Sequence, residues 1–151
     1  MAEDMTPEQL VAKLNAVAAA AHRGAVMGLQ QACLARQATA MRYCTPGQSP
    51  FDPMVFPTKK GGTGAPLDTG LLRANIYAYT EDKGDEIQAG VGCGADLRGP
   101  GTYPGYPLFV HEGTSKMQAR PFIRMAVEDE EDDTRERLAA AIDAAIKGAA
   151  L

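Results

Sequence analysis

The chain has 151 residues and a formal net charge of −4; 45% of its residues are hydrophobic and only 6% are aromatic. This balance predicts a single domain with a small core and excludes wholesale disorder. The negative charge argues against a protein that binds nucleic acid over its whole surface, and no apolar run reaches the ~18 residues of a membrane span.

The N-terminus and the cysteines are those of a cytoplasmic protein. The opening stretch, MAEDMTPEQL, is acidic and polar and lacks the apolar segment of a secretory signal. Cys33, Cys44 and Cys93 are an odd number of cysteines without metal-ligand spacing. We therefore expect reduced thiols, no metal and no cofactor.

The first predicted element is a long helix that follows Thr6 and continues to about Tyr43, before Pro46. Thr6 can cap it, Pro7 suits its first position, and Gln9 completes a capping box. Apolar residues follow at helical spacing and form a narrow stripe: Leu10, Leu14, Val17, Ala21, Leu29, Ala32 and Ala40. We expect Gly24 and Gly28 to be weak points, and we expect this helix to need a packing surface.

The next stretch, TPGQSPFDPMVFPTKKGGTGAP, is rich in proline and glycine, so we expect a long mobile loop over residues 45–65. Residues 75–80 alternate between apolar and polar, EDKGDE is typical of a turn, and a second alternating run starts at Ile87. These features predict a hairpin, in which Gly90, Gly92 and Gly94 weaken the second strand or bring another backbone close.

A third short strand is predicted over Leu108 to Glu112, and a closing helix from near Pro121 carries a stripe of Leu138, Ile142 and Ile146. The expected fold is α+β, in one domain over residues 1–151. It consists of a long N-terminal helix, a small and mostly antiparallel sheet of three to four strands, and a C-terminal helix packed on that sheet.

Groups for catalysis are scarce, and we expect no enzyme. His22 lies in an alanine-rich helical stretch, where packing or surface exposure is the ordinary role. His111 and Glu112 are neighbours, and on a strand they would point to opposite faces. No Ser-His-Asp or Cys-His set stands out, and GGTGAP lacks the spacing of a phosphate-binding loop.

Two blocks of sequence resemble the tail-completion, or head–tail joining, proteins of long-tailed bacteriophages. The first block, YPLFVHEGTSKMQARPFIRMAV, matches the family at Tyr106, Phe109, Val110, Gly113, Thr114, Ser115, Lys116, Met117, Ala119, Arg120, Pro121, Phe122 and Ala126. The second block, APLDTGLLR, precedes it and matches at Ala65, Pro66, Asp68, Thr69, Gly70, Leu72 and Arg73. The chain departs from the family at His111-Glu112, where a Glu and an aromatic are usual, and at Met125, where a proline is usual.

The resemblance implies a structural protein of the virion neck or upper tail, assembled in the host cytoplasm, that helps join the DNA-filled head to the tail. It implies a ring of about six copies, contacts with head-side connector or stopper proteins and with the tail terminator or major tail tube protein, and passage of double-stranded DNA without sequence-specific binding. The implied interface residues are Phe109, His111, Glu112, Gly113, Thr114, Ser115, Lys116, Met117, Arg120, Arg124, Asp68, Thr69 and Arg73. A tail terminator ring and a small soluble binding module outside the virion are the alternatives.

Two features of this region have alternative interpretations. Arg120 and Arg124 are four residues apart, so on a helix they share one face and can pair with carboxylates at an interface; alternatively, they are ordinary surface charges beside a simple turn. The acidic run Glu128 to Asp133 suits a solvated helix start. Alternatively, part of it lines a channel for DNA and repels the phosphates; the candidate lumen residues are Glu128, Asp129, Glu131 and Asp132.

Overall fold

The structure is a computed structural model that describes residues 5–51, 70–94 and 106–150. Helix α1 spans Pro7–Tyr43 and runs for about 55 Å at the usual rise per residue. Its capping box is formed: the Thr6 N–H donates to Gln9 Oε1 (2.9 Å), and the Gln9 N–H donates to Thr6 Oγ1 (3.3 Å). The predicted start and end of this helix are therefore confirmed.

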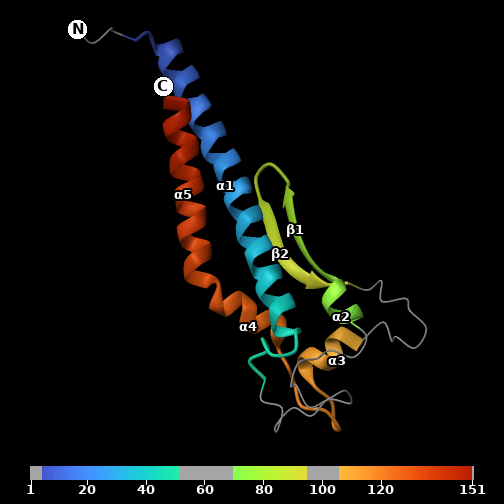
Figure 1. Cartoon of the computed structure of the whole chain (residues 1–151). Coiled ribbons are helices and arrows are strands. Elements are labelled where there is room, and N and C mark those ends of the chain that lie inside the picture. Colours follow the sequence, from blue (N-terminus) through green and yellow to red (C-terminus); the bar gives the residue numbers. More distant parts are fainter. Residues whose placement is uncertain (1–4, 52–69, 95–105, 151) are drawn as a thin grey trace.

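The predicted closing helix is divided in two, α4 over Phe122–Asp129 and α5 over Glu131–Ala150. Helix α5 runs antiparallel to α1 along most of its length (Figure 1). It packs on α1 itself, and the sheet lies on another side of α1, so the predicted packing of this helix on the sheet is wrong. The alanine-rich stripe of α5 has too little bulk to fill a wide gap, and it fits closely against another helix with small side chains.

Small residues on α1 allow this close approach. Ala20, Gly24, Gly28 and Ala32 recur every four residues and are buried. A Cβ built on Gly24 would lie 2.8 Å from the carbonyl oxygen of Ala141, and one built on Gly28 would lie 3.0 Å from Leu138 Cα. The two glycines that interrupt the apolar stripe are therefore contact points with α5, a role that was not predicted beside their expected weakness within the helix.

The sheet is a hairpin of β1, Ile76–Asp82, and β2, Ile87–Cys93, which are antiparallel with Ile76 opposite Cys93 and Asp82 opposite Ile87. Within the described residues the sheet has two strands, where three to four were predicted. The outward rings of Tyr79 and Tyr77 lie over Gly90 and Gly92, the residues opposite them. The predicted close approach at these glycines is thus made by aromatic side chains, which cover the bare backbone.

Residues 106–112, which include the predicted third strand, form the short helix α3, Tyr106–Glu112. Pro107 and Val110 are buried while Leu108 and Phe109 are exposed, which is the spacing of a helix rather than the alternation of a strand. Proline also suits the first turn of a helix better than the interior of a sheet.

The core lies at one end of the molecule, where the C-terminal half of α1 meets the hairpin, α2 (Leu71–Ala74), α3 and α4 (Figure 1). Its buried members are Ala40, Tyr43, Cys44, Phe51, Leu72, Ile76, Val110, Phe122 and Ala126. At the other end of α1, Leu10 and Leu14 remain exposed, so the N-terminal part of the predicted stripe is not covered by the described residues. No described helix is long and apolar enough to cross a membrane.

The three cysteines carry free thiols, as predicted. Burial, with a smaller contribution from the nearby Cys93, raises the pKa of the Cys44 thiol to about 12, although Arg73 opposes this shift. Burial also raises the pKa of Cys93 to about 11, although the Gly94 N–H opposes this shift. These thiols therefore belong to the core and stay protonated at neutral pH.

Candidate functional site

The block of residues 106–127 that resembles tail-completion proteins begins with α3, which presents one face to the core and one to solvent. Val110 is 1% exposed, whereas Leu108 and Phe109 are 61% and 46% exposed. The helix closes with the Gly113 N–H donating to the Phe109 carbonyl at 2.9 Å. The buried face anchors the segment, and the exposed apolar pair is left on the surface.

A tight turn follows at Gly113, whose φ of +79° lies in the left-handed region. The Thr114 N–H donates to the Met117 carbonyl at 2.7 Å, and the Met117 N–H donates back to the Thr114 carbonyl at 3.2 Å. A Cβ on Gly113 would lie 2.7 Å from the Ala119 nitrogen, so the returning chain leaves no room for a side chain. This geometry fixes the exposed tip of Thr114, Ser115 and Lys116.

The far side of the turn is anchored again. The Arg120 N–H donates to the Val110 carbonyl at 2.9 Å, and the Phe122 side chain is fully buried. Arg120 is only 4% exposed, and burial lowers the pKa of its guanidinium, while Tyr106 acts in the opposite direction. Arg120 lies two residues before the start of α4, whereas Arg124 is exposed on that helix. The two arginines were expected to share a face if both lay on one helix, and this condition is not met.

His111, Glu112 and Arg124 form a small polar cluster beside Phe122. The Arg124 backbone N–H donates to His111 Nε2 at 3.4 Å, which leaves Nδ1 to donate to Glu112 Oε1 at 2.6 Å. The Arg124 guanidinium also contacts Glu112 Oε1 at 3.4 Å. His111 and Glu112 were predicted to point to opposite faces of a strand; on a helix they bond to each other.

The acidic run is divided by its contacts. The Tyr43 hydroxyl donates to Asp129 Oδ2, and the Thr39 hydroxyl donates to Glu130 Oε1 at 2.6 Å. The next three acids pair along α5, Glu131 and Asp132 with Arg135 and Asp133 with Arg137. All four candidate lumen residues, Glu128, Asp129, Glu131 and Asp132, are exposed, and of these only Asp129 also bonds to α1.

Thr39 and Tyr43 are contributors that sequence reasoning missed. They lie four residues apart on α1, so they share a face of that helix. Their hydroxyls reach the junction between α4 and α5. The sequence signal that could have identified them is the pair of hydroxyl side chains at helical spacing in an alanine-rich helix.

The second sequence block meets the first in the core. Leu72 is buried in the same cluster as Val110 and Phe122, although the two blocks are separated in the chain by the hairpin. Arg73 is exposed and donates to Thr45 Oγ1 at 3.2 Å. Asp68 and Thr69 lie outside the described residues, as does the predicted loop beyond Phe51.

None of the described residues form a group of three or more His, Cys, Asp or Glu side chains that could hold a metal ion. Comparisons with protein-family models, with characterised proteins and with solved structures returned no match for this chain. The functional assignment therefore rests on the residues and their arrangement.

Proposed function

We propose that this chain is a structural protein of the neck or upper tail of a long-tailed phage or a phage-derived particle, and that it helps to join the filled head to the tail. One observation carries the proposal: the two blocks that resemble tail-completion proteins converge on one core. Leu72 from the APLDTGLLR block packs with Val110 and Phe122 from the YPLFVHEGTSKMQARPFIRMAV block. Both blocks therefore contribute buried side chains to the core from which the exposed tip at Thr114 to Lys116 projects.

The exposed part of the segment suits contact between proteins. Leu108 and Phe109 are large apolar side chains at the surface, next to the polar tip at Thr114 to Lys116. Apolar side chains with a polar rim are the usual composition of an interface. The buried anchors on both sides of Gly113 hold this patch in one pose, as a protein that acts through its shape requires.

Deletion of the gene tests the function directly. We expect full heads and separate tails in electron micrographs, with infectivity restored by the gene in trans. Normal infectious particles after deletion would end the proposal. Tails of uncontrolled length would instead favour the terminator alternative, because a cap that ends tube growth also sets its length.

Complementation by two matched variants tests the site. Leu108→Asp and Val11→Asp each replace an exposed apolar side chain with a carboxylate, and the two positions are similarly exposed, at 61% and 56%. We expect Leu108→Asp to leave heads and tails unjoined and Val11→Asp to restore joining. If Leu108→Asp, shown to be folded by circular dichroism, restores infectivity fully, the exposed pair Leu108 and Phe109 on α3 does not form the contact that joins heads to tails.

The channel hypothesis has its own test. Neutralising Glu128, Glu131 and Asp132 together should slow DNA ejection from assembled particles, because a negative wall keeps phosphates from adhering. The control is a triple neutralisation of exposed acids outside α4 and α5, at Glu8, Asp85 and Glu86. Equal ejection rates in both triple variants and the parent would retire this hypothesis.

A further inference from the structure

The hydrogen-bond register of the hairpin shows which backbone N–H and C=O groups of β1 do not bond to β2. The Gly94 N–H donates to the Asn75 carbonyl at 2.9 Å, and the Lys83 N–H donates to the Glu86 carbonyl at 2.8 Å. In an antiparallel ladder, bonded pairs alternate with non-bonded pairs. The odd-numbered residues of β1 therefore bond to β2, and Ile76, Ala78, Thr80 and Asp82 direct their N–H and C=O groups away from it.

Helix α1 bonds to one outward backbone group at the start of this edge and to a side chain at its end, and it leaves the middle open. Gln37 Nε2 donates to the Ile76 carbonyl at 2.7 Å, and His22 Nε2 lies 2.8 Å from Asp82 Oδ2. No described residue makes a hydrogen bond to the outward groups of Ala78 or Thr80. A free edge of this kind is a template for another strand.

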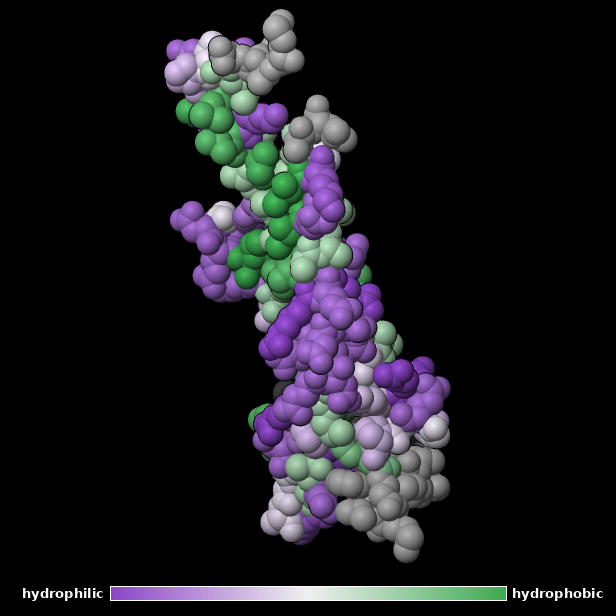
Figure 2. Space-filling model, turned by 90° about the vertical axis from the view of Figure 1, so that its left-hand side faces the viewer, coloured by the Kyte–Doolittle hydropathy of each residue, from purple (hydrophilic) through white to green (hydrophobic). Residues whose placement is uncertain are grey.

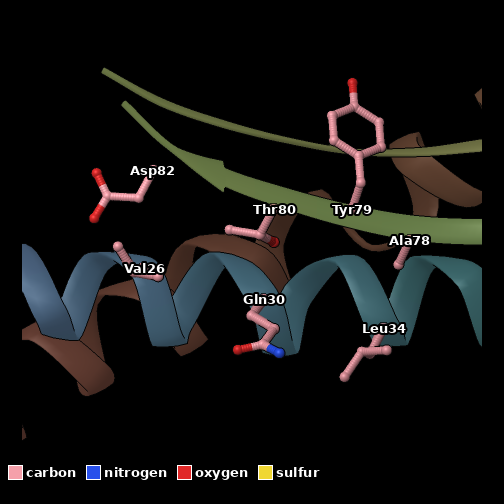
Figure 3. A pocket seen from close by; sticks show the side chains of 7 residues that line it. All are labelled: Val26, Gln30, Leu34, Ala78, Tyr79, Thr80 and Asp82. Carbon is pink, nitrogen blue, oxygen red and sulfur yellow. The ribbon is translucent and has the colours of Figure 1, made fainter. Parts of the chain in front are cut away.

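A groove runs beside the open middle of β1. It has a volume of about 210 Å³ and is lined by Val26, Gln30, Leu34, Ala78, Tyr79, Thr80 and Asp82. Figure 3 shows β1 running along α1, with Ala78 and Thr80 turned toward the helix and Tyr79 turned away from it. Leu34 is 52% exposed and gives the groove an apolar side.

Strand β2 has a free edge of its own on the opposite side of the sheet. By the same register, Ala89 and Val91 direct their N–H and C=O groups away from β1. Neither receives a hydrogen bond there from the described residues. Within residues 5–51, 70–94 and 106–150, one copy thus offers two different edges, one on each side of a two-stranded sheet.

We propose that copies of this chain join head to tail, with the free edge of β1 in one copy pairing with the free edge of β2 in the next. The contact joins different surfaces of identical subunits, so a rotation from copy to copy can close into a ring. Since β1 and β2 are antiparallel within a chain, the same rotation makes the new strand pair antiparallel too. The ladder between copies then continues the ladder within each copy.

Side chains at this junction are complementary in charge. In the register that repeats the pairing within the chain, Glu81 of one copy lies opposite Gln88 of the next. Lys83 of that next copy is bonded to this same Gln88 at 2.9 Å and lies 3.6 Å from Glu81 of its own copy, in an exposed pair that leaves the ammonium group accessible to the second carboxylate.

The inference deepens the proposed function by assigning the contact that would build its ring. It commits to a second copy of the chain as the occupant of the β1 edge. An extended segment of a different protein is the competing occupant. The two are separated by whether the purified chain, with nothing added, protects its own edges.

Two measurements on the full chain test the pairing. The first is hydrogen exchange of the wild-type chain over a concentration series, with oligomeric state followed by light scattering. We expect assembly to slow exchange of the Ala78, Thr80, Ala89 and Val91 amides by roughly tenfold or more. Oligomers with unprotected edges, or a monomer throughout the series, would overturn the inference.

The second measurement mixes two edge variants. Thr80→Pro removes an outward N–H of β1 and Ala89→Pro an outward N–H of β2, and neither removes a bond between the two strands. With folding checked by circular dichroism, each variant alone should be monomeric, and the mixture should form a one-to-one dimer that grows no further. Assembly of either variant alone, or a mixture that stays monomeric, contradicts head-to-tail pairing. The exchange measurement uses no variant, so it decides the matter if a proline variant fails to fold.

The particle experiment remains separate from both measurements. Heads and tails that fail to join after gene deletion support the neck function even if the edges prove unprotected. Normal particles would defeat the neck function even if the purified chain forms rings.

Discussion

The close packing of α5 on α1 predicts opposite outcomes for one substitution at two glycines. Gly24 and Gly148 both lie within helices. A Cβ on Gly24 would lie 2.8 Å from backbone atoms of Ala141 and Ile142, whereas a Cβ on Gly148 would meet no heavy atom within 4 Å. Gly24→Ala should therefore destabilise the fold, and Gly148→Ala should stabilise it.

The magnitude follows from two opposing effects. Alanine is favoured over glycine within a helix by about 1 kcal/mol. Overpacking against backbone that cannot move aside costs about 1–3 kcal/mol. Only the first effect acts at Gly148, so the free energies of unfolding of the two variants should differ by about 1–3 kcal/mol. Gly28→Ala should fall between them, because its nearest contacts begin at 3.0 Å and include the movable tip of Leu138.

Thermal unfolding followed by circular dichroism at the helical signal measures this difference. For a chain of this size, about 1 kcal/mol shifts Tm by roughly 2–4 °C, so Gly24→Ala should melt roughly 2–12 °C below Gly148→Ala. Urea midpoints should give the same order. If Gly24→Ala proves as stabilising as Gly148→Ala, helix α5 does not lie against Gly24. The proposed close packing of α5 on the small residues of α1 is then refuted.

Three further predictions follow from the core and the turn. Gly113→Ala should destabilise the chain by ~1–3 kcal/mol more in urea than Gly84→Ala, because both have positive φ but only Gly113 faces a crowded backbone; equal costs would contradict the tight turn. Tyr43→Phe should cost ~1–3 kcal/mol by removing the hydroxyl donated to a carboxylate, against almost nothing for the exposed Tyr79→Phe. Because burial raises the pKa of Cys44 from an ordinary 9.0 to about 12, its stabilising contribution is complete below pH 9.0 and is lost as the pH rises toward 12. Urea midpoints across this range should fall less steeply for Cys44→Ala, and unchanged slopes would show that the thiol is not buried.

Local signals in the sequence predicted the elements that depend on nearby residues. The capping box at Thr6 and Gln9 defines the start of α1 through bonds between neighbours. The hairpin follows from two alternating runs around an Asp- and Gly-rich turn. In both cases the determining interactions lie within a few residues of each other, so periodicity and turn chemistry were sufficient.

Elements whose form depends on distant partners were predicted less well. A short apolar run such as Tyr106–Glu112 suits a strand or a helix by composition alone. Its helical form is tied to Val110, which is buried against Phe122 and accepts a hydrogen bond from Arg120. A glycine at position 24 is unfavourable for the helical conformation of α1 alone, and its presence there is explained only by the close approach of α5.

The candidate site was predicted in its residues but not in its geometry. Gly113 was named from the sequence as an interface residue, and its positive φ places it at a tight turn. The burial of Arg120 was not foreseen, since an arginine is normally at the surface and only the fold shows the chain returning to the core. The free edge of β1 could not be found from side chains at all, because it consists of backbone groups whose direction depends on register.

The partnership of α1 and α5 also has a consequence for synthesis on the ribosome. Gly24 meets Ala141, and the hairpin, α3 and α4 lie between them in the chain. Contacts between such distant parts form slowly, because a long stretch of chain must be ordered before they can be made. The nascent polypeptide therefore carries Ala20, Gly24, Gly28 and Ala32 of α1 uncovered by α5 until that later helix emerges. Apolar surface that stays exposed during synthesis favours aggregation.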